Sequence, residues 1–415
     1  MAKGIDQAHD EHTSILSYND ENSLACVLSV AYIWARNEYV IHREYATGKG
    51  TMIAQALKKS SVTNHFVSAD DAIVPSASWL QTEWQQARNL ARDTQAPVVL
   101  VVDEIQKVPN WSVAVKSLYD ADRRNLVEVK PVLSGSSSLL LHKGLEDSLM
   151  GRFELIRSPH WSLSECSKAF GFTLDDYLFY GGYPGAARFA GDTVRWASYM
   201  RDAIIEPTIS QDILALEDVR KPALMRALFR LGALYSAQEL SYNKLLGQLQ
   251  DAGNTTTLAH YLDLLSKAGM LTGLPRFSDK ETDRRKSSPR FMVYDTSLMT
   301  AISDKGRERL IGEPDLRGHL VESSVGARLI ARGADEGFDV MWWRDGNEEV
   351  DFVLRKGTAL VAIEVKSGHE SGQSGMASFL QKNPQARRII VGGASQGACT
   401  VEEFLLDEVP LFGRA

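Results

Sequence analysis

Residues 97–104 read PVVLVVDE, an unbroken apolar run that ends in two adjacent carboxylates, Asp103 and Glu104. A short continuous run of aliphatic residues is typical of a strand that is buried on both faces of a sheet. Two neighbouring carboxylates at the end of such a strand repel each other, and a bound cation relieves that repulsion. We therefore expect a Mg²⁺ position at Asp103 and Glu104. The alternative is a pair of exposed acids that begins a surface turn.

The sequence around this run alternates between extended and helical patterns up to about residue 158. Extended runs at 38–41, 98–102 and 127–133 are separated by helical spacing, including a helix predicted from Thr51. Strands that alternate with helices predict a parallel sheet with helices on both faces. Residues 1–158 are thus expected to form an α/β domain.

A glycine and a lysine at positions 48 and 49 stand where a phosphate-binding loop needs them. Such a P-loop wraps phosphates with backbone N–H groups and adds a lysine for the phosphates and a hydroxyl for Mg²⁺. The candidate ATP-binding residues are therefore Gly48, Lys49, Gly50 and Thr51. Arg43 replaces the first glycine of the usual loop, and Gly50 replaces the usual hydroxyl, which leaves Thr51 as the nearest one. These departures bear on hydrolysis more than on nucleotide binding.

The strand predicted at 127–133 is followed by a serine run at 134–138, interrupted by one glycine. A small polar side chain at this strand end can contact a γ-phosphate or position water, and Ser136 is the candidate. Serines at strand ends are otherwise ordinary turn residues.

Residues 159–277 have mostly helical periodicity and are expected to form a middle domain. Within them, 242–249 and 256–265 both show apolar residues at helical spacing, and the turn at 251–255 offers an Asn or Thr as a cap for the second helix. This pair predicts a helix-turn-helix unit, which serves either as a packing module or as a DNA reader.

Residues 278–415 form the third predicted domain. The charged segment 278–290 is expected to be an exposed loop or hairpin tip. A helix and four strands are then predicted, at 319–332, 338–343, 349–354, 359–365 and 388–392.

Two acids and a lysine lie on neighbouring strands of this third region. Glu364 and Lys366 are two residues apart, so their side chains point to the same face, and a hairpin brings Asp351 close to them. The arrangement is similar to the PD-(D/E)XK core, in which two acids hold a divalent metal and the lysine activates water for phosphodiester attack. Glu322 on the preceding helix is a further candidate carboxylate. The alternative is a salt-bridged, exposed face without chemistry.

Three segments, 101–111, 133–140 and 148–152, occur in this order in a widespread prokaryotic family that the chain resembles. It is the family of AAA-type P-loop ATPases whose C-terminal domain of unknown function has a PD-(D/E)XK nuclease-like core. The resemblance spans Lys49 to Ser367 and continues through 181–184, 261–265, 294–296 and 343–345.

The resemblance implies an AAA-type domain that binds and hydrolyses ATP, in which Asp103 holds Mg²⁺ and Glu104 polarises the attacking water. It also places an arginine at Arg152, where it can reach a γ-phosphate in its own or a neighbouring subunit, so self-association through the ATPase domain is expected. The C-terminal domain is expected to act on or bind DNA or RNA. Two alternatives stay open, a metal-dependent nuclease regulated by nucleotide and a non-catalytic, nucleotide-responsive interaction protein.

Composition narrows the class of protein. A chain of 415 residues with 44% hydrophobic and 24% charged residues is typical of a globular protein with two or three domains. The formal net charge of -7 argues against general coating of nucleic acid. Three well-separated cysteines fit a reducing cytoplasm, and the longest apolar stretch, 24–35, is too short to cross a bilayer. We therefore expect a cytoplasmic protein without a membrane partner.

Overall fold

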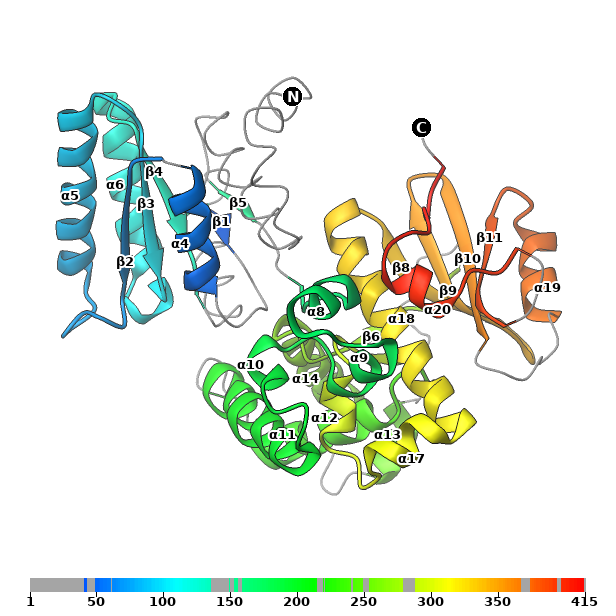
Figure 1. The fold of residues 1–415 in the computed structure, drawn as a ribbon. Coiled ribbons are helices and arrows are strands. Elements are labelled where there is room, and N and C mark those ends of the chain that lie inside the picture. The colour runs from blue at the N-terminus through cyan, green and yellow to red at the C-terminus, as the bar shows by residue number, and fades with distance from the viewer. Residues whose placement is uncertain are drawn as a thin grey trace. The chain divides into compact units, whose positions relative to one another are not determined.

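The computed structural model divides the chain into two compact units, Met1–Pro159 and His160–Ala415 (Figure 1). The residues that it describes are 41–42, 49–60, 62–135, 149, 153–155, 159–214, 219, 221–239, 242–248, 254–278, 288–366, 374–393 and 397–413. The sequence-based division of the second unit into a middle and a C-terminal domain stays a prediction.

The N-terminal unit is built on a parallel three-stranded sheet, as the sequence predicts. Strand β3 (Val98–Asp103) lies at its centre, between β2 (Asn64–Ser68) and β4 (Val129–Leu133). A short parallel pair joins β1 (Ile41–His42) to β5 (Glu154–Leu155). Strand β2 was not predicted, because its sequence NHFVS begins with two polar residues and none of its side chains is fully buried.

Helices cover both faces of this sheet (Figure 1). One face carries α4 (Lys49–Ser60), which packs Ile53, Ala56 and Leu57 against the core. The other face carries α5 (Ala77–Thr94) and α6 (Trp111–Asn125). Alternate residues of β3 pack into the hydrophobic cores on the two faces of the sheet. Val99 and Val101 face α4, whereas Val98, Leu100 and Val102 face α5 and α6. Burial on both faces explains the unbroken apolar run.

The direction of α4 follows from the short connection to β2. Only residues 61–63 separate the end of α4 from the start of β2, so the C-terminal end of the helix lies at the edge where the parallel strands begin. Twelve helical residues span about 18 Å, close to the length of a five-residue strand. The first turn of α4, beginning at Lys49, is therefore directed to the edge where the strands end.

The first half of the second unit is mainly helical. Asn254 accepts a hydrogen bond from the backbone N–H of Thr257 at 2.9 Å and so caps the second helix of the predicted helix-turn-helix pair. An antiparallel pair of strands, β6 and β7, follows this pair of helices. The elements are α8 (Leu163–Phe170), α9 (Leu174–Tyr180), α10 (Pro184–Ala187), α11 (Thr193–Tyr199), η2 (Met200–Ile205), η3 (Thr208–Ile213), α12 (Pro222–Leu234), α13 (Tyr242–Gln248), α14 (Thr255–Lys267), β6 (Leu271–Leu274), β7 (Arg290–Val293), α16 (Ser297–Thr300) and α17 (Arg307–Gly312).

The second half of this unit is a four-stranded mixed sheet with the order β11-β10-β9-β8. Strands β8, β9 and β10 are antiparallel neighbours, and β10 and β11 run parallel. A register shift between Met341 and Trp343 breaks the alternation of β9, so that Val350 and Val353 join one core although they are three residues apart. The elements are α18 (Pro314–Glu336), β8 (Asp339–Asp345), β9 (Glu348–Lys356), β10 (Ala359–Lys366), α19 (Ser374–Lys382), β11 (Arg387–Gly392) and α20 (Val401–Leu405).

Within the part of the chain that the structure describes, no helix combines the length and the hydrophobicity that a membrane crossing needs.

Candidate nucleotide site and acidic centre

The carboxyl edge of the N-terminal sheet gathers the acids that end β3 and the serine that follows β4. Asp103 and Glu104 are both partly exposed there. Ser134 Oγ donates a hydrogen bond to Asp103 Oδ1 at 2.5 Å, and the Ser134 carbonyl accepts one from the backbone N–H of Ile105. Carboxylate and hydroxyl oxygens are hard ligands of the kind that Mg²⁺ prefers. The residues at this edge fit a magnesium-bound nucleotide.

Glu104 adopts an uncommon backbone conformation that turns the chain out of the sheet. Its φ of 53° lies in the left-handed region, which costs energy for a residue with a side chain and is enriched at functional sites. Gln106 Nε2 donates to Glu104 Oε2 at 2.6 Å and orients that carboxylate. The adjacent Lys107 has a raised pKa, chiefly because its Nζ donates to Asp70, with further attraction from Glu104 and Asp103.

Several predicted nucleotide-binding residues lie outside the described residues, namely Gly48, Ser136 and Arg152. Lys49, Gly50 and Thr51 form the first turn of α4, for which the structure gives the backbone course alone.

The contacts of Ser134 and Gln106 were not predicted. The contact of Ser134 could have been predicted, because this serine directly follows the strand next to the one that ends in the two acids. Nothing in the sequence distinguished Gln106 from a surface glutamine.

Asp351, Glu364 and Lys366 come together in the second unit, as the predicted hairpin requires. Lys366 Nζ donates to Glu364 Oε1 at 2.7 Å, and both side chains are largely buried. Asp351 Oδ2 accepts a hydrogen bond from the backbone N–H of Val365 at 2.8 Å, across the paired strands β9 and β10. We name the four carboxylates at this place, Glu322, Glu349, Asp351 and Glu364, the acidic centre.

The acidic centre contains a buried arginine, Arg290, which the sequence analysis predicted to lie in an exposed loop. The side chain of Arg290 is 2% exposed, whereas the charged segment that ends with it was expected to be an exposed loop. Arg290 is the first residue of β7, and its guanidinium forms an ion pair with Glu349, lies 3.2 Å from Glu322 Oε1 and 3.8 Å from Asp351 Oδ1. Its carbon Cζ lies 5.0 Å from the centre of the Trp342 ring. The expectation for Arg290 was wrong because position in a charged segment does not reveal burial.

Burial raises the pKa values of three carboxylates of the acidic centre, Glu322, Asp351 and Glu364. The pKa of Glu322 rises to about 8, first because of burial and then because of the negative charge of Asp351, although Arg290 opposes the shift. The pKa values of Asp351 and Glu364 are raised as well, again chiefly by burial. The carboxylates thus outnumber the cations that face them.

The acidic centre differs from the ligand set that a divalent metal needs. A metal held by protein acids requires several side chains to converge on one empty point. Among the described residues no three His, Cys, Asp or Glu side chains are placed to do so. Instead, the guanidinium of Arg290 lies between three of the carboxylates and Lys366 pairs with the fourth. The residues as arranged here do not fit a metal ion.

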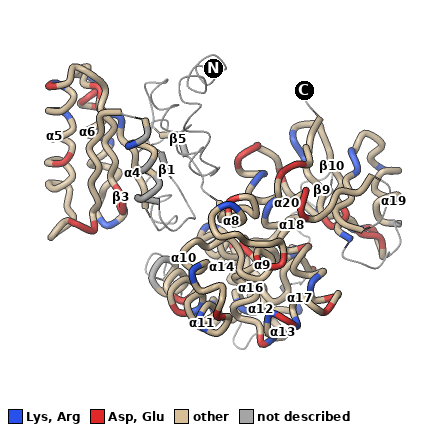
Figure 2. Tube along the Cα trace, viewed as in Figure 1, with Lys and Arg blue, Asp and Glu red and all other residues tan. Residues whose placement is uncertain are grey.

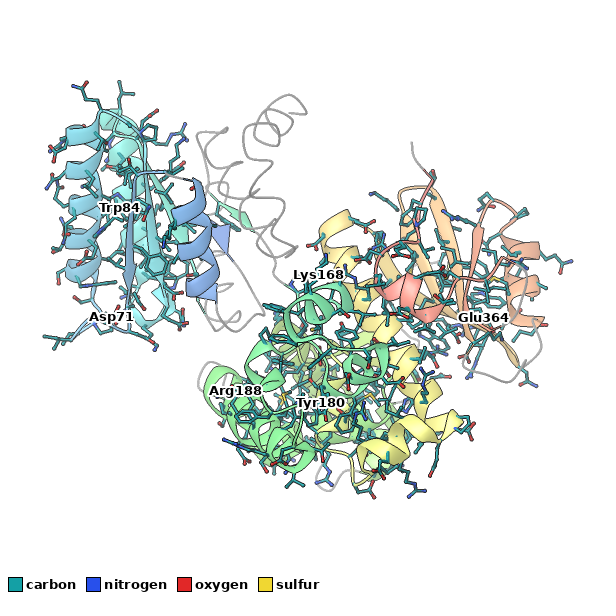
Figure 3. The ribbon with its side chains drawn as sticks, viewed as in Figure 1. Asp71, Trp84, Lys168, Tyr180, Arg188 and Glu364 are labelled. Carbon is teal, nitrogen blue, oxygen red and sulfur yellow. The ribbon has the colours of Figure 1, made fainter. Side chains whose placement is uncertain are left out.

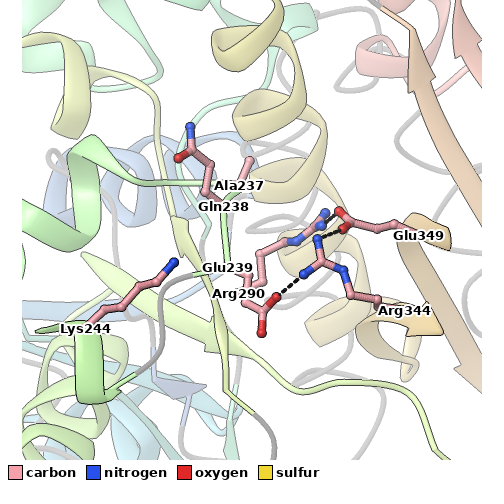
Figure 4. Close-up of a pocket in the computed structure, with 7 residues that line it drawn as sticks. All are labelled: Ala237, Gln238, Glu239, Lys244, Arg290, Arg344 and Glu349. Carbon is pink, nitrogen blue, oxygen red and sulfur yellow. Dashed lines mark hydrogen bonds and ion pairs between the residues drawn. The ribbon is translucent and has the colours of Figure 1, made fainter. Parts of the chain in front are cut away.

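A polar cavity of about 490 Å³ adjoins the acidic centre (Figure 4). Figure 4 shows Arg290 and Arg344 both meeting Glu349, while Arg344 also reaches Glu239. The cavity is lined by Ala237, Gln238, Glu239, Lys244, Arg290, Arg344 and Glu349. Ion pairs therefore connect the residues after α12 to the C-terminal sheet.

Three segments of the chain match family models. Residues 46–167 match an AAA domain. Residues 171–309 match a domain of unknown function, DUF8612, and residues 317–401 match another, DUF4143. No curated protein matches the chain.

Solved structures resemble the chain at low identity. The Walker-type ATPase of Pyrococcus abyssi is 13% identical with a TM-score of 0.45, and the likeness covers 67% of this chain and 94% of that one. The ORC2 protein of Aeropyrum pernix is 14% identical with a TM-score of 0.41, covering 72% and 93%. The RuvB Holliday junction branch migration motor of Thermotoga maritima is 15% identical with a TM-score of 0.31, covering 65% and 94%.

The N-terminal unit is thus similar in sequence to an AAA domain, and it has the parallel, helix-covered sheet on which P-loop ATPases are built.

Proposed function

We propose that the N-terminal unit binds ATP with Mg²⁺ and hydrolyses it, and that the second unit responds to the nucleotide state. The observation that carries this proposal is the end of β3, where Asp103 and Glu104 lie at the carboxyl edge of a parallel sheet with Ser134 bonded to the first acid. The AAA-domain match over residues 46–167 supports it. Mg²⁺ supplies charge that neutralises the phosphates.

The two acids have different tasks in this proposal. Asp103, whose carboxylate is oriented by the hydrogen bond from Ser134, is the proposed ligand of Mg²⁺. Glu104 is the proposed general base that orients the attacking water and takes its proton. Lys49, Gly50 and Thr51 begin α4, and the backbone N–H groups and the dipole at the N-terminal end of a helix favour phosphate. Gly48, Ser136 and Arg152 complete the proposed nucleotide-binding set.

A comparison of three variants tests the proposal. Wild-type protein with Mg²⁺ and a slowly hydrolysed ATP analogue is expected to show a raised thermal midpoint, and Lys49→Ala is expected to lose that rise. Lys58→Ala, on the exposed far end of the same helix, is the matched control and should behave as wild type. Glu104→Gln is expected to keep binding and to lower turnover about 100-fold or more.

The outcomes separate the hypotheses. Absence of any nucleotide effect on wild type would remove the ATPase proposal. Binding without turnover in wild type would favour the non-catalytic, nucleotide-responsive interaction protein.

A metal-dependent nuclease is the second candidate function. It is supported by the convergence of Asp351, Glu364 and Lys366, and by Glu364 Oε2, a buried oxygen without a hydrogen-bond partner among the described residues. It is opposed by the guanidinium inside the acidic centre. DNA and RNA are the proposed substrates, although Figure 2 shows basic and acidic residues interspersed along the traced chain. The test is cleavage of plasmid, oligonucleotide or RNA with Mg²⁺ or Mn²⁺ that disappears in Glu364→Gln.

A further inference from the structure

We propose that Arg290 is the built-in cation of the acidic centre, so that Glu322, Glu349 and Asp351 are held together by a guanidinium and not by a divalent metal. The acidic centre is then an ionic clamp between segments that are far apart in the sequence. This inference concerns the second unit and does not depend on ATP binding.

The first support is the position of the guanidinium. Arg290 reaches the carboxylates from β7, Glu322 lies on α18, and Glu349 and Asp351 lie on β9. Arg290 Nη1 also donates to the backbone carbonyl of Asp351 at 3.3 Å. A planar fork with several fixed donors can meet two or more carboxylates at once.

The second support is burial. The Arg290 side chain is 2% exposed, while the carboxylates around it are between 19% and 27% exposed. A guanidinium buried without acidic partners would be strongly unfavourable. The arginine and the acids therefore require each other, and a divalent ion entering between them would meet a fixed positive charge.

The third support is that the neighbouring cations are also paired. Lys366 donates to Glu364, and Arg344 bridges Glu349 to Glu239. The clamp therefore extends from Glu239, which follows α12, through both arginines to the sheet. Loss of Arg290 would leave three carboxylates facing one another, which is the condition that attracts a metal.

The test is a Mn²⁺ titration of full-length, nucleotide-free protein followed by electron paramagnetic resonance, together with thermal midpoints in EDTA and in Mn²⁺. Wild type is expected to bind no Mn²⁺ that depends on Asp351 and to have the same midpoint in both solutions. Arg290→Met is expected to lower the midpoint and to gain one Mn²⁺ that restores part of the loss. The double variant Arg290→Met/Asp351→Asn should lose that Mn²⁺, and Arg188→Met, at an exposed arginine, is the matched control.

Two results would overturn the proposal. One is Mn²⁺ binding by wild type that disappears in Asp351→Asn, because the centre would then hold a metal with Arg290 in place. The other is a folded Arg290→Met variant that still binds no Mn²⁺, because Arg290 would then not be what excludes the ion. If Arg290→Met does not fold, the wild-type and Asp351→Asn titrations decide alone: Mn²⁺ binding that depends on Asp351 refutes the proposal, and its absence supports it.

Discussion

The Asp122 carboxylate shows how much one buried side chain can organise in the N-terminal unit. It is 3% exposed and accepts hydrogen bonds from Trp84 Nε1 and from Arg88 Nε, both at 2.6 Å. Trp84 is fully buried on α5 (Figure 3), and Asp122 lies on α6. One carboxylate therefore ties together the two helices that cover the same face of the sheet.

We predict that Asp122→Ala lowers the free energy of unfolding of this unit by about 3 kcal/mol or more, because it leaves a largely buried guanidinium without its acid. Urea unfolding measures the change. Asp93→Ala removes an exposed acid from α5 and should stay within about 0.5 kcal/mol of wild type. Equal effects of the two substitutions would show that the buried contacts contribute little.

At the scale of elements, a glycine pair after α9 docks on the turn that follows β7. The backbone N–H of Gly182 donates to Asp295 Oδ2 at 2.7 Å, and Asp295 Oδ1 accepts from the backbone N–H of Ser297. Gly181 has φ of +67°, and a Cβ built there would lie 1.8 Å from Asp295 Oδ1. A Cβ built on Gly182 would lie 2.1 Å from the backbone oxygen of Trp161. The chain after α9 can lie against this turn and against Trp161 only because neither glycine carries a side chain.

Gly182→Ala is predicted to destabilise the second unit by about 3 kcal/mol, because the added methyl group meets backbone that cannot move aside cheaply. The comparison is Gly191→Ala, where a Cβ would meet nothing within 4 Å. Thermal unfolding of both variants measures the difference. A Gly182→Ala midpoint equal to that of Gly191→Ala would contradict the close approach.

The regular elements with strong periodicity were predicted well. The sequence predicts the ends of β3 and β10 to within a residue, because polar residues on either side of an apolar run mark where the buried strand begins and ends. It misses β2, none of whose residues is fully buried. It also begins α18 late, at residue 319 where the helix starts at Pro314. Exposed first turns lack the apolar spacing that marks a helix.

At the scale of the whole molecule, the chain consists of two units with separate cores. The N-terminal core consists of the residues that pack around β3, and a separate core in the second unit includes Phe277, Met341 and Phe379. Units with their own cores unfold as separate cooperative transitions unless a large interface couples them.

Differential scanning calorimetry of the full chain is therefore expected to show two transitions. A slowly hydrolysed ATP analogue with Mg²⁺ should raise the transition of the N-terminal unit most, because a ligand chiefly stabilises the unit that binds it directly. The Asp122→Ala and Gly182→Ala variants assign the two transitions, since each lowers one of them. A nucleotide that shifted both transitions equally would mean that the units unfold together.

The sequence by itself determined the parallel sheet of the N-terminal unit, the place of Asp103 and Glu104 at its carboxyl edge, and the hairpin that joins Asp351 to Glu364 and Lys366. These follow from local patterns, because burial on both faces demands an unbroken apolar run and a two-residue period sets which side chains share a face. Only the tertiary structure decided what neutralises the acidic centre. Arg290 is the last residue of the charged segment 278–290 and the first residue of β7. No local sequence pattern shows that its guanidinium is buried among these carboxylates.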